Sequence, residues 1–254
     1  MAKIIVVGYM GRLGGAICRL ASSMEDVMVA AGVDVAANSA PSIFPVYQDI
    51  SECAEKADCI IDCSLAPAVP SSINYAMKTN TPLVVCTTGL SEETLALMRE
   101  ASKSVPIFCS ANMSLGINLM CALSEKLVKI LANAGFDVEI VEKHHNKKLD
   151  APSGTAFMLA DAINDAAGGT YEYIYDRSDI KQARGKNEMG IHAVRGGTIF
   201  GEHEVIFAGN EELLEIKHSI ASRDVFATGA LKAALYTAKK QPGMYDMKQL
   251  IDEA

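Results

Sequence analysis

Short apolar runs separated by amphipathic stretches dominate the first 110 residues of the chain. The runs lack the polar alternation of a strand with one wet face, so both faces of each strand are expected to be covered. They comprise residues 3–7, 27–33, 59–62, 82–86 and 106–109. The stretches between them predict helices at about 12–23, 67–79 and 91–104. Strands alternating with helices predict an α/β fold built on a doubly wound parallel sheet.

A glycine-rich turn follows the first predicted strand. The stretch VVGYMGRLGG places Gly8, Gly11 and Gly14 between that strand and a helix. A dinucleotide site needs a tight turn, a close backbone approach to pyrophosphate and a helix N-terminus, and this spacing supplies all three. The alternative is a tight turn without a ligand. Asp34 favours the dinucleotide, because it ends the second strand where an acid accepts the ribose hydroxyls.

The residue after Asp34 bears on the choice of cofactor. It is Val35, so the 2′-phosphate of NADPH would face a carboxylate without an adjacent cation, which favours NADH. Arg12 is the nearby cation that softens this preference. The stretches CTTG (86–89) and SANMS (110–114) end strands at the carboxyl edge, where ligands bind in open α/β sheets. They are predicted to contact the nicotinamide half, the alternative being ordinary turns.

The pattern changes after about residue 112. A long apolar helix (116–133) leads to runs that alternate polar and apolar residues, which predict a half-exposed antiparallel sheet. A pair of helices at 224–240 and about 245–253 ends the chain. We interpret this as two domains, residues 1–113 plus 224–254 and residues 114–223.

Residues 142–156 read EKHHNKKLDAPSGTA and concentrate basic side chains in an acidic chain. A solvated surface loop is one interpretation. The other is a pocket for a small anion, because the cations precede Pro152 and a predicted helix start whose backbone N–H groups are free to bind an anion. A lysine held among positive charges is also a ready proton donor. Asp150, within the cluster, is expected to orient a basic partner or to cap the turn.

Bulk properties exclude several classes of function. The formal net charge of −8 argues against a dedicated nucleic-acid surface, and no apolar run approaches the length of a membrane span. No signal peptide is visible at the N-terminus. The seven cysteines include no CxxC pair, so we expect reduced thiols in a cytoplasmic protein and no metal site.

The stretch VEIVEKHHNKKLDAPSGTA resembles the signature E-x-H-H-x-x-K-x-D-x-P-S-G-T-A of the 4-hydroxy-tetrahydrodipicolinate reductases, also called dihydrodipicolinate reductases. The resemblance extends over the chain through the glycine loop, TTG, ANMSLGIN, GEHEV and FATGA. It implies an N-terminal Rossmann domain, a second mixed α/β domain for substrate binding and oligomerisation, and a homotetramer built through the C-terminal sheets. The implied reaction reduces the dihydrodipicolinate precursor to tetrahydrodipicolinate with NADH or NADPH, on the route to diaminopimelate and lysine.

The resemblance also implies roles for individual residues. His144 would be the acid/base and Lys148 the proton donor, while His145 would hold a substrate carboxylate. The same carboxylate would be bound at the helix start formed by Ser153, Gly154 and Thr155. The cofactor contacts would be Gly8, Tyr9, Met10, Gly11, Arg12, Leu13, Asp34, Cys86, Thr87, Thr88, Ser110, Ala111, Asn112 and Met113.

Two other functions remain open on the sequence. One is a different Rossmann dehydrogenase that acts on an amino or hydroxy acid. The other is a nucleotide-sensing regulator without catalysis, which the joint presence of His144 and Lys148 disfavours because a sensor needs no proton relay.

Overall fold

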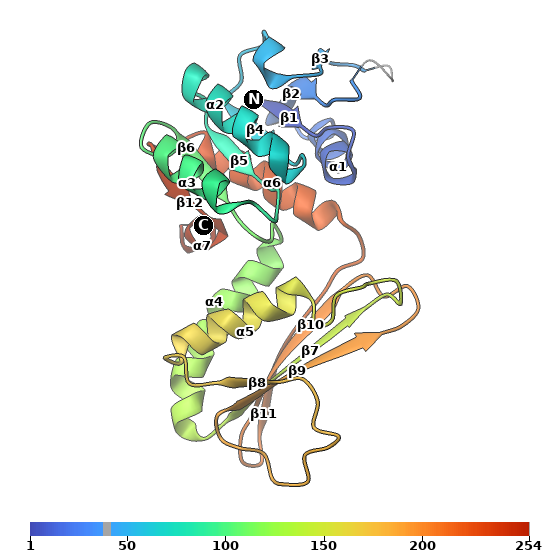
Figure 1. The fold of residues 1–254 in the computed structure, drawn as a ribbon, viewed down its shortest axis with the longest axis vertical. Helices are drawn as coiled ribbons and strands as arrows, with labels where there is room; N and C mark the ends of the chain where they lie inside the picture. The colour runs from blue at the N-terminus through green and yellow to red at the C-terminus, as the bar shows by residue number, and fades with distance from the viewer. Residues whose placement is uncertain (38–41, 254) are drawn as a thin grey trace. The chain divides into compact units, whose positions relative to one another are not determined.

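The computed structural model describes residues 1–37 and 42–253, which form two compact units (Figure 1). The first unit consists of Met1–Leu115 and Arg223–Ala254, and the second of Gly116–Ser222. The first unit is therefore discontinuous in sequence, and its last helices are made after the whole second unit.

The first unit is built on a parallel sheet with the strand order β12-β6-β5-β4-β1-β2-β3. Its strands are β1 (Ala2–Val7), β2 (Val27–Val33), β3 (Val46–Tyr47), β4 (Cys59–Asp62), β5 (Leu83–Val85), β6 (Pro106–Cys109) and β12 (Gly243–Tyr245). Its α-helices are α1 (Arg12–Ala21), α2 (Val69–Thr79), α3 (Glu92–Ala101), α6 (Asp224–Thr237) and α7 (Met247–Asp252). Short 3-10 helices η1 (Ile50–Glu52) and η2 (Ala66–Ala68) complete it.

Helices cover both faces of this sheet, as the apolar runs predict. Ile4 and Val6 of β1 pack in one cluster with α1, α6 and α7. Ile5 and Val7 point the other way, into a cluster with α2 and α3. Because successive residues of a strand face opposite sides, an uninterrupted apolar run is what a strand between two helical layers requires. The α/β doubly wound architecture is confirmed.

The second unit contains a five-stranded sheet with the order β11-β10-β7-β9-β8. Its strands are β7 (Asp137–His144), β8 (Glu172–Ile174), β9 (Glu188–Arg195), β10 (Glu202–Ala208) and β11 (Leu213–Ser219). Its helices are α4 (Leu115–Leu131), whose first residue belongs to the first unit, η3 (Ala132–Ala134) and α5 (Gly154–Ala166).

This second sheet is mixed, not wholly antiparallel as its residue alternation suggests. Strand β7 pairs in parallel with β9 and antiparallel with β10. Alternation of polar and apolar residues shows that one face of a strand is buried, but it does not show the direction of the neighbouring strand. Periodicity therefore cannot distinguish parallel from antiparallel pairing. Helices α4 and α5 lie on one face and bury residues such as Ile140 and Val205 (Figure 1). On the opposite face, Val141 and Ile206 are half-buried among charged side chains.

Candidate active site

The glycine turn between β1 and α1 is shaped by two close backbone approaches. Gly8 has a positive φ of 79°, and a Cβ there would lie 2.8 Å from the carbonyl oxygen of Cys63. A Cβ on Gly14 would overlap the backbone of Gly8 and Tyr9, so only glycine lets α1 start this close to the strand. Gly11 caps α1 without a side-chain hydrogen bond, which leaves the first-turn N–H groups to bind an anion. The geometry fits the pyrophosphate of a dinucleotide.

A cavity of about 350 Å³ lies beside this turn. Asp34 lines it, and its Oδ2 accepts a hydrogen bond from the Met10 backbone N–H at 3.3 Å, which places the carboxylate at the tip of the glycine loop. Its Oδ1 accepts from the backbone N–H of Ala36 at 3.1 Å. The remaining lining comes from residues around two further strand ends, including Gln48, Asp49, Cys63, Ser64, Leu65 and Ser71. The cavity is of a size and position to accept a nucleoside at the end of β2.

The ends of β4, β5 and β6 lie side by side in the sheet, and those of β5 and β6 carry the predicted nicotinamide contacts. Buried Asp62 ties two of these ends together, because its Oδ1 accepts from the Ser64 hydroxyl at 2.6 Å and from the Thr87 hydroxyl at 3.3 Å. At the third end, Ser110 donates to the Asn112 carbonyl at 3.0 Å. The predicted contacts thus share one edge, although Cys86–Thr88 and Ser110–Met113 do not line the cavity beside Asp34.

Not all predicted cofactor residues present their side chains to that cavity. The Tyr9 ring packs on Phe44 with centroids 5.7 Å apart, and Leu13 packs against the core. Met113 is buried in the same core cluster. Tyr9 and Leu13 are half-buried and Met113 is buried, whereas Met10, Arg12, Thr88 and Ala111 are exposed.

In the second unit, β7 ends at His144 within a cluster of polar groups. The Nδ1 atom of His144 lies 2.6 Å from Oε2 of Glu142, and the His144 side chain is 12% exposed. A carboxylate accepts hydrogen bonds, so Nδ1 carries the proton and Nε2 is the atom left to exchange one. Glu142 is fully buried, and Arg195 of β9 donates to both of its oxygens at 2.7 and 2.6 Å.

The charged groups around Glu142 set its ionisation. Burial alone would raise the pKa of this carboxyl, but the hydrogen bonds from Arg195 and His144 outweigh it and hold the pKa below its usual value. The site therefore keeps a carboxylate next to His144 at neutral pH, which holds the ring and its Nδ1–H in place.

The chain turns after His144, and Lys148 on this turn lies close enough to His203 to contribute to the lowering of its pKa. The turn is closed by the Lys148 backbone N–H, which donates to the His145 carbonyl at 3.1 Å. The Lys148 ammonium lies 2.9 Å from Oδ1 of Asp150, so Asp150 does hold a basic partner, as the sequence predicts. Hydrogen bonds, the one from Lys148 first and one from the Gly154 backbone among the others, lower the pKa of Asp150. The Asp150 carboxylate therefore lies between the Lys148 ammonium and the start of α5.

Ser153 is the N-cap of α5, and this changes the role expected for its side chain. The Ser153 hydroxyl accepts from the Ala156 backbone N–H at 3.2 Å and lies 3.0 Å from Nε2 of His203. The Ser153 side chain is buried, so its hydroxyl caps the helix and bonds His203. Gly154 is exposed and Thr155 half-buried at the same helix start, near His145 in sequence.

Sequence reasoning missed Glu142, Arg195 and His203 as members of this cluster. Glu142 opens the quoted signature, and Arg195 and His203 lie in the alternating runs of the second sheet. The sequence did contain one signal for Glu142. It is a charged residue on the apolar face of a predicted strand, and such a group needs a partner from a neighbouring strand. The partners themselves could not be read, since the pairing of β7 with β9 and β10 is non-local.

Within residues 1–37 and 42–253, no three His, Cys, Asp or Glu side chains are grouped closely enough to hold a metal ion. The helices in this described part of the chain are too short or too polar to cross a membrane.

Comparison with known proteins places these two units in one family. The family model for the N-terminus of dihydrodipicolinate reductase matches residues 2–113, and the model for its C-terminus matches residues 116–251. A 4-hydroxy-tetrahydrodipicolinate reductase of Caldanaerobacter subterraneus subsp. tengcongensis is 51% identical over 251 residues, which cover 99% of this chain and 98% of the relative. One from Clostridium tetani is 46% identical over 252 residues, with the same coverage of both chains.

Solved structures share the fold at lower identity. The dipicolinate-bound dihydrodipicolinate reductase of Paenisporosarcina sp. TG-14 aligns with a TM-score of 0.82 at 21% identity, over 98% of this chain and 99% of that one. A probable dehydrogenase from Thermotoga maritima aligns with a TM-score of 0.62 at 13% identity, over 98% and 92%. The two family models together, and each of these two relatives alone, span nearly the full chain. The chain therefore belongs to the dihydrodipicolinate reductase family.

Proposed function

We propose that His144 and Lys148 handle the proton in the reaction that family membership gives this chain. That reaction is the NAD(P)H-dependent reduction of the dihydrodipicolinate precursor to tetrahydrodipicolinate, in diaminopimelate and lysine biosynthesis. The observation that carries the proposal is the buried Glu142–His144 pair at the end of β7, with Lys148 close enough to neighbouring His203 to lower its pKa. The hydrogen bond to Glu142 engages Nδ1 of His144 and leaves Nε2 to exchange a proton, and Lys148 offers three N–H donors.

The substrate is a cyclic dicarboxylate, and the start of α5 supports a carboxylate site. The first-turn N–H groups of Gly154 and Thr155, the positive end of the helix and the cation of Lys148 all favour an anion. His145 supplies a further ring donor, although its Nδ1 accepts from the Lys147 backbone N–H at 3.2 Å, so its Nε2 is the atom that would face the substrate. One carboxylate of the substrate would then be held while His144 or Lys148 delivers the proton.

The nicotinamide cofactor would be held by the first unit and supplies the hydride when bound. The glycine turn holds the pyrophosphate, Asp34 accepts from the adenine ribose, and the strand ends at Cys86–Thr88 and Ser110–Met113 hold the nicotinamide half. We propose that NADH is preferred. Two carboxylates, Asp34 and Asp49, line the cavity, and the sequence carries no Lys, Arg or His from Val35 to Glu55.

We further propose that residues 1–113 with 224–254 act as the dinucleotide domain and residues 114–223 as the substrate domain. The boundaries follow the change in sequence pattern near residues 113 and 223. The half-exposed face of the second sheet supports a homotetramer assembled through it. The described cysteines are all free, which supports a reducing, cytoplasmic environment.

The test is a turnover assay that follows nicotinamide absorbance with freshly generated precursor. His144→Ala should lose most turnover while binding NADH as the unmodified protein does. Pyridine-2,6-dicarboxylate, a planar mimic of the substrate, should compete with it and protect residues 153–155 from hydrogen exchange. Turnover with an amino or hydroxy acid but not with the precursor would refute the proposal, as would cofactor binding without any turnover.

A further inference from the structure

Glu142 is surrounded by donors from three different segments of the second unit. Its Oε2 faces Nδ1 of His144 at 2.6 Å and Nη1 of Arg195 at 2.7 Å. Its Oε1 accepts from Nη2 of Arg195 at 2.6 Å and from the backbone N–H of Ser153 at 2.9 Å. Four donors converge on one buried carboxylate, which satisfies both oxygens.

Each of these bonds fixes a different part of the site. The bond to His144 fixes the ring and its tautomer. The bond to Ser153 fixes the residue that caps α5, and so the position of the N–H groups of Gly154 and Thr155. Arg195 supplies the compensating charge and also donates to the carbonyl of Asp150 at 2.7 Å, which anchors the loop that carries Lys148. A buried charge of this kind is tolerated only when it is paired and hydrogen-bonded.

We propose that Glu142, held by Arg195, is the positioning residue that sets the distance and orientation between the proton-exchanging His144 and the carboxylate site at the start of α5. This inference rests on the proposed roles of His144 and α5, and adds a residue that touches neither substrate nor cofactor. Its role is to make one rigid unit of groups that lie on a strand end, a loop and a helix.

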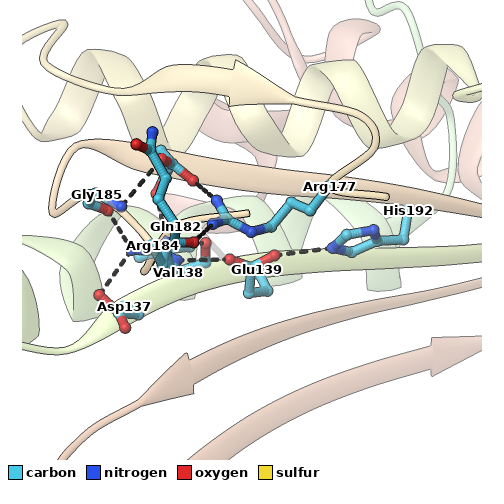
Figure 2. A network of polar contacts seen from close by, with 9 residues as sticks. Asp137, Val138, Glu139, Arg177, Gln182, Arg184, Gly185 and His192 are labelled. Carbon is cyan, nitrogen blue, oxygen red and sulfur yellow. Dashed lines mark hydrogen bonds and ion pairs between the residues drawn. The ribbon is translucent and has the colours of Figure 1, made fainter. Parts of the chain in front are cut away.

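The same strand offers a matched control on the opposite face of the sheet. There Glu139 pairs with Arg184 at 2.8 Å and with His192 at 2.9 Å, so a glutamate, an arginine and a histidine are again grouped (Figure 2). Arg184 also bonds Asp137 and backbone carbonyls, and the cluster fastens the loop before β9 to β7 (Figure 2). The side chains of residues 139 and 142 point to opposite faces because they are three positions apart on the strand.

The proposal is tested first on the protein without ligands, with ¹⁵N-labelled histidine and NMR. The chain has five histidines, so the ring signals can be assigned by substitution. In the unmodified protein, His144 should carry its proton on Nδ1. In Glu142→Gln an amide has one acceptor oxygen for four donors, so His144 should move toward the Nε2–H tautomer. Glu139→Gln should leave the His144 signals unchanged.

Kinetics then connect the geometry to turnover. The charged or titratable groups around His144 and its ring neighbour His203 are Glu142 on β7, Arg195 on β9, Lys148 on the following loop and His218 on β11. Glu142→Gln should lower kcat by roughly 10²-fold and move the pH–rate profile, because it removes the negative charge beside the ring that exchanges the proton. The Glu139→Gln profile should keep its shape. Arg195→Lys keeps the positive charge but not the bidentate contact, so its kcat and pH–rate profile should lie between those of Glu142→Gln and Glu139→Gln.

The outcomes separate this inference from the proposed function. An unchanged His144 tautomer and an unchanged pH profile in Glu142→Gln would overturn the positioning role. A shifted tautomer with full turnover would instead leave the positioning role standing and refute the catalytic role of His144. If Glu142→Gln does not fold, the tautomer in Arg195→Lys decides: Nδ1–H at the unmodified level with unchanged kinetics would overturn the proposal.

Discussion

Lys148 and Asp150 form an ion pair at the mouth of the candidate substrate site. The ammonium is 22% and the carboxylate 58% exposed, so water screens the pair and it contributes little to stability. The Asp150 carboxylate lies at the start of α5, where the proposed site would hold a substrate carboxylate. An incoming dicarboxylate would exchange one anionic partner of Lys148 for another.

The first prediction concerns the proton donor. Lys148→Ala should lower turnover by roughly 10²–10⁴-fold, the usual worth of a positioned general acid, with NADH affinity nearly unchanged. Lys148→Arg should restore little, because guanidinium keeps its charge but does not release a proton near neutral pH. Steady-state kinetics and cofactor titration measure both effects. Near-full activity in Lys148→Arg would show that Lys148 serves only as a cation for the substrate.

The second prediction concerns His203 and acid stability. The pKa of His203 is lowered from an ordinary 6.5 to about 4. Burial of the ring is the main cause, and the charge of the neighbouring His144 adds to it. Between pH 6.5 and pH 4, His203 binds a proton in the unfolded chain but not in the folded protein. Its contribution to the free energy of unfolding is therefore complete above pH 6.5 and is lost as the pH falls toward 4. From pH 7 to pH 5, His203 should account for a loss of about 2 kcal/mol.

Urea unfolding at both pH values measures this loss. His203→Gln, which can still bond the Ser153 hydroxyl, should remove it, whereas His192→Gln on the more exposed face should retain it. An identical pH dependence in His203→Gln would show that this histidine is not the group that protonates.

The third prediction concerns cofactor choice. The Val35 side chain is 86% exposed beside the nucleoside cavity and follows the carboxylate of Asp34. Val35→Arg should raise NADPH affinity by roughly tenfold, the worth of one charge-assisted contact to a phosphate, and change NADH affinity little. Nicotinamide fluorescence titrations with both cofactors test this. Tighter NADPH than NADH binding by the unmodified protein would place a cation elsewhere, with Arg12 the first residue to replace.

At the scale of elements, the turn between β1 and α1 depends on glycine at particular positions. The fourth prediction compares two neighbours. Gly14→Ala would press a methyl group into the backbone of Gly8 and Tyr9, at a cost of about 1–3 kcal/mol or more, and should weaken NADH binding as the turn opens. Gly15→Ala places its Cβ 3.7 Å from the nearest atom, an ordinary contact, and should leave both properties near their original values. Thermal unfolding and cofactor titration measure the pair; equal effects would disprove the packing argument.

The elements that could be predicted are those with enough residues to show a period. The long runs of the first unit and the helices were predicted to within a few residues, except for α5, of which only the start was predicted. Strands β3, β8 and β12 were missed, because two or three residues carry no measurable alternation and their assignment depends on a neighbour. Ser153 illustrates a finer limit: the sequence predicts a helix start there, but the burial that turns its hydroxyl inward comes from His203, 50 residues away.

At the scale of the whole molecule, the half-exposed face of the second sheet supports assembly. The fifth prediction is that the chain runs as a tetramer of the 27.1 kDa subunit, and that Ile206→Arg shifts it to smaller species by placing a charge within that face. Ile130→Arg on α4, where the side chain is 67% exposed, should not. Light scattering after size exclusion measures the mass. Dissociation by the α4 variant alone would move the interface to the helices.

The site as a whole could be predicted only in its local parts. The glycine turn, Asp34 and the 142–156 stretch each carry their signal within a few residues of sequence. The wall of the nucleoside cavity formed by Gln48, Asp49 and residues 63–72 escaped prediction, as did the partners of Glu142. These groups come together only through parallel pairing and crossovers, which depend on long-range contacts that no local pattern contains.

The interrupted first unit has a consequence for the growing chain on the ribosome. Five residues of α6 (Ala227, Ala230, Leu231, Ala233 and Ala234) belong to the core cluster that covers Ile4, Val6 and Phe108 of the sheet. At translation rates of about 5–20 residues per second, roughly 5–20 seconds separate the synthesis of residue 115 from that of α6. During that interval one side of the nascent sheet has α1 but lacks α6 and α7, whereas the second unit needs no residue made after Ser222. The nascent chain therefore exposes an apolar surface to chaperones until the last thirty or so residues emerge.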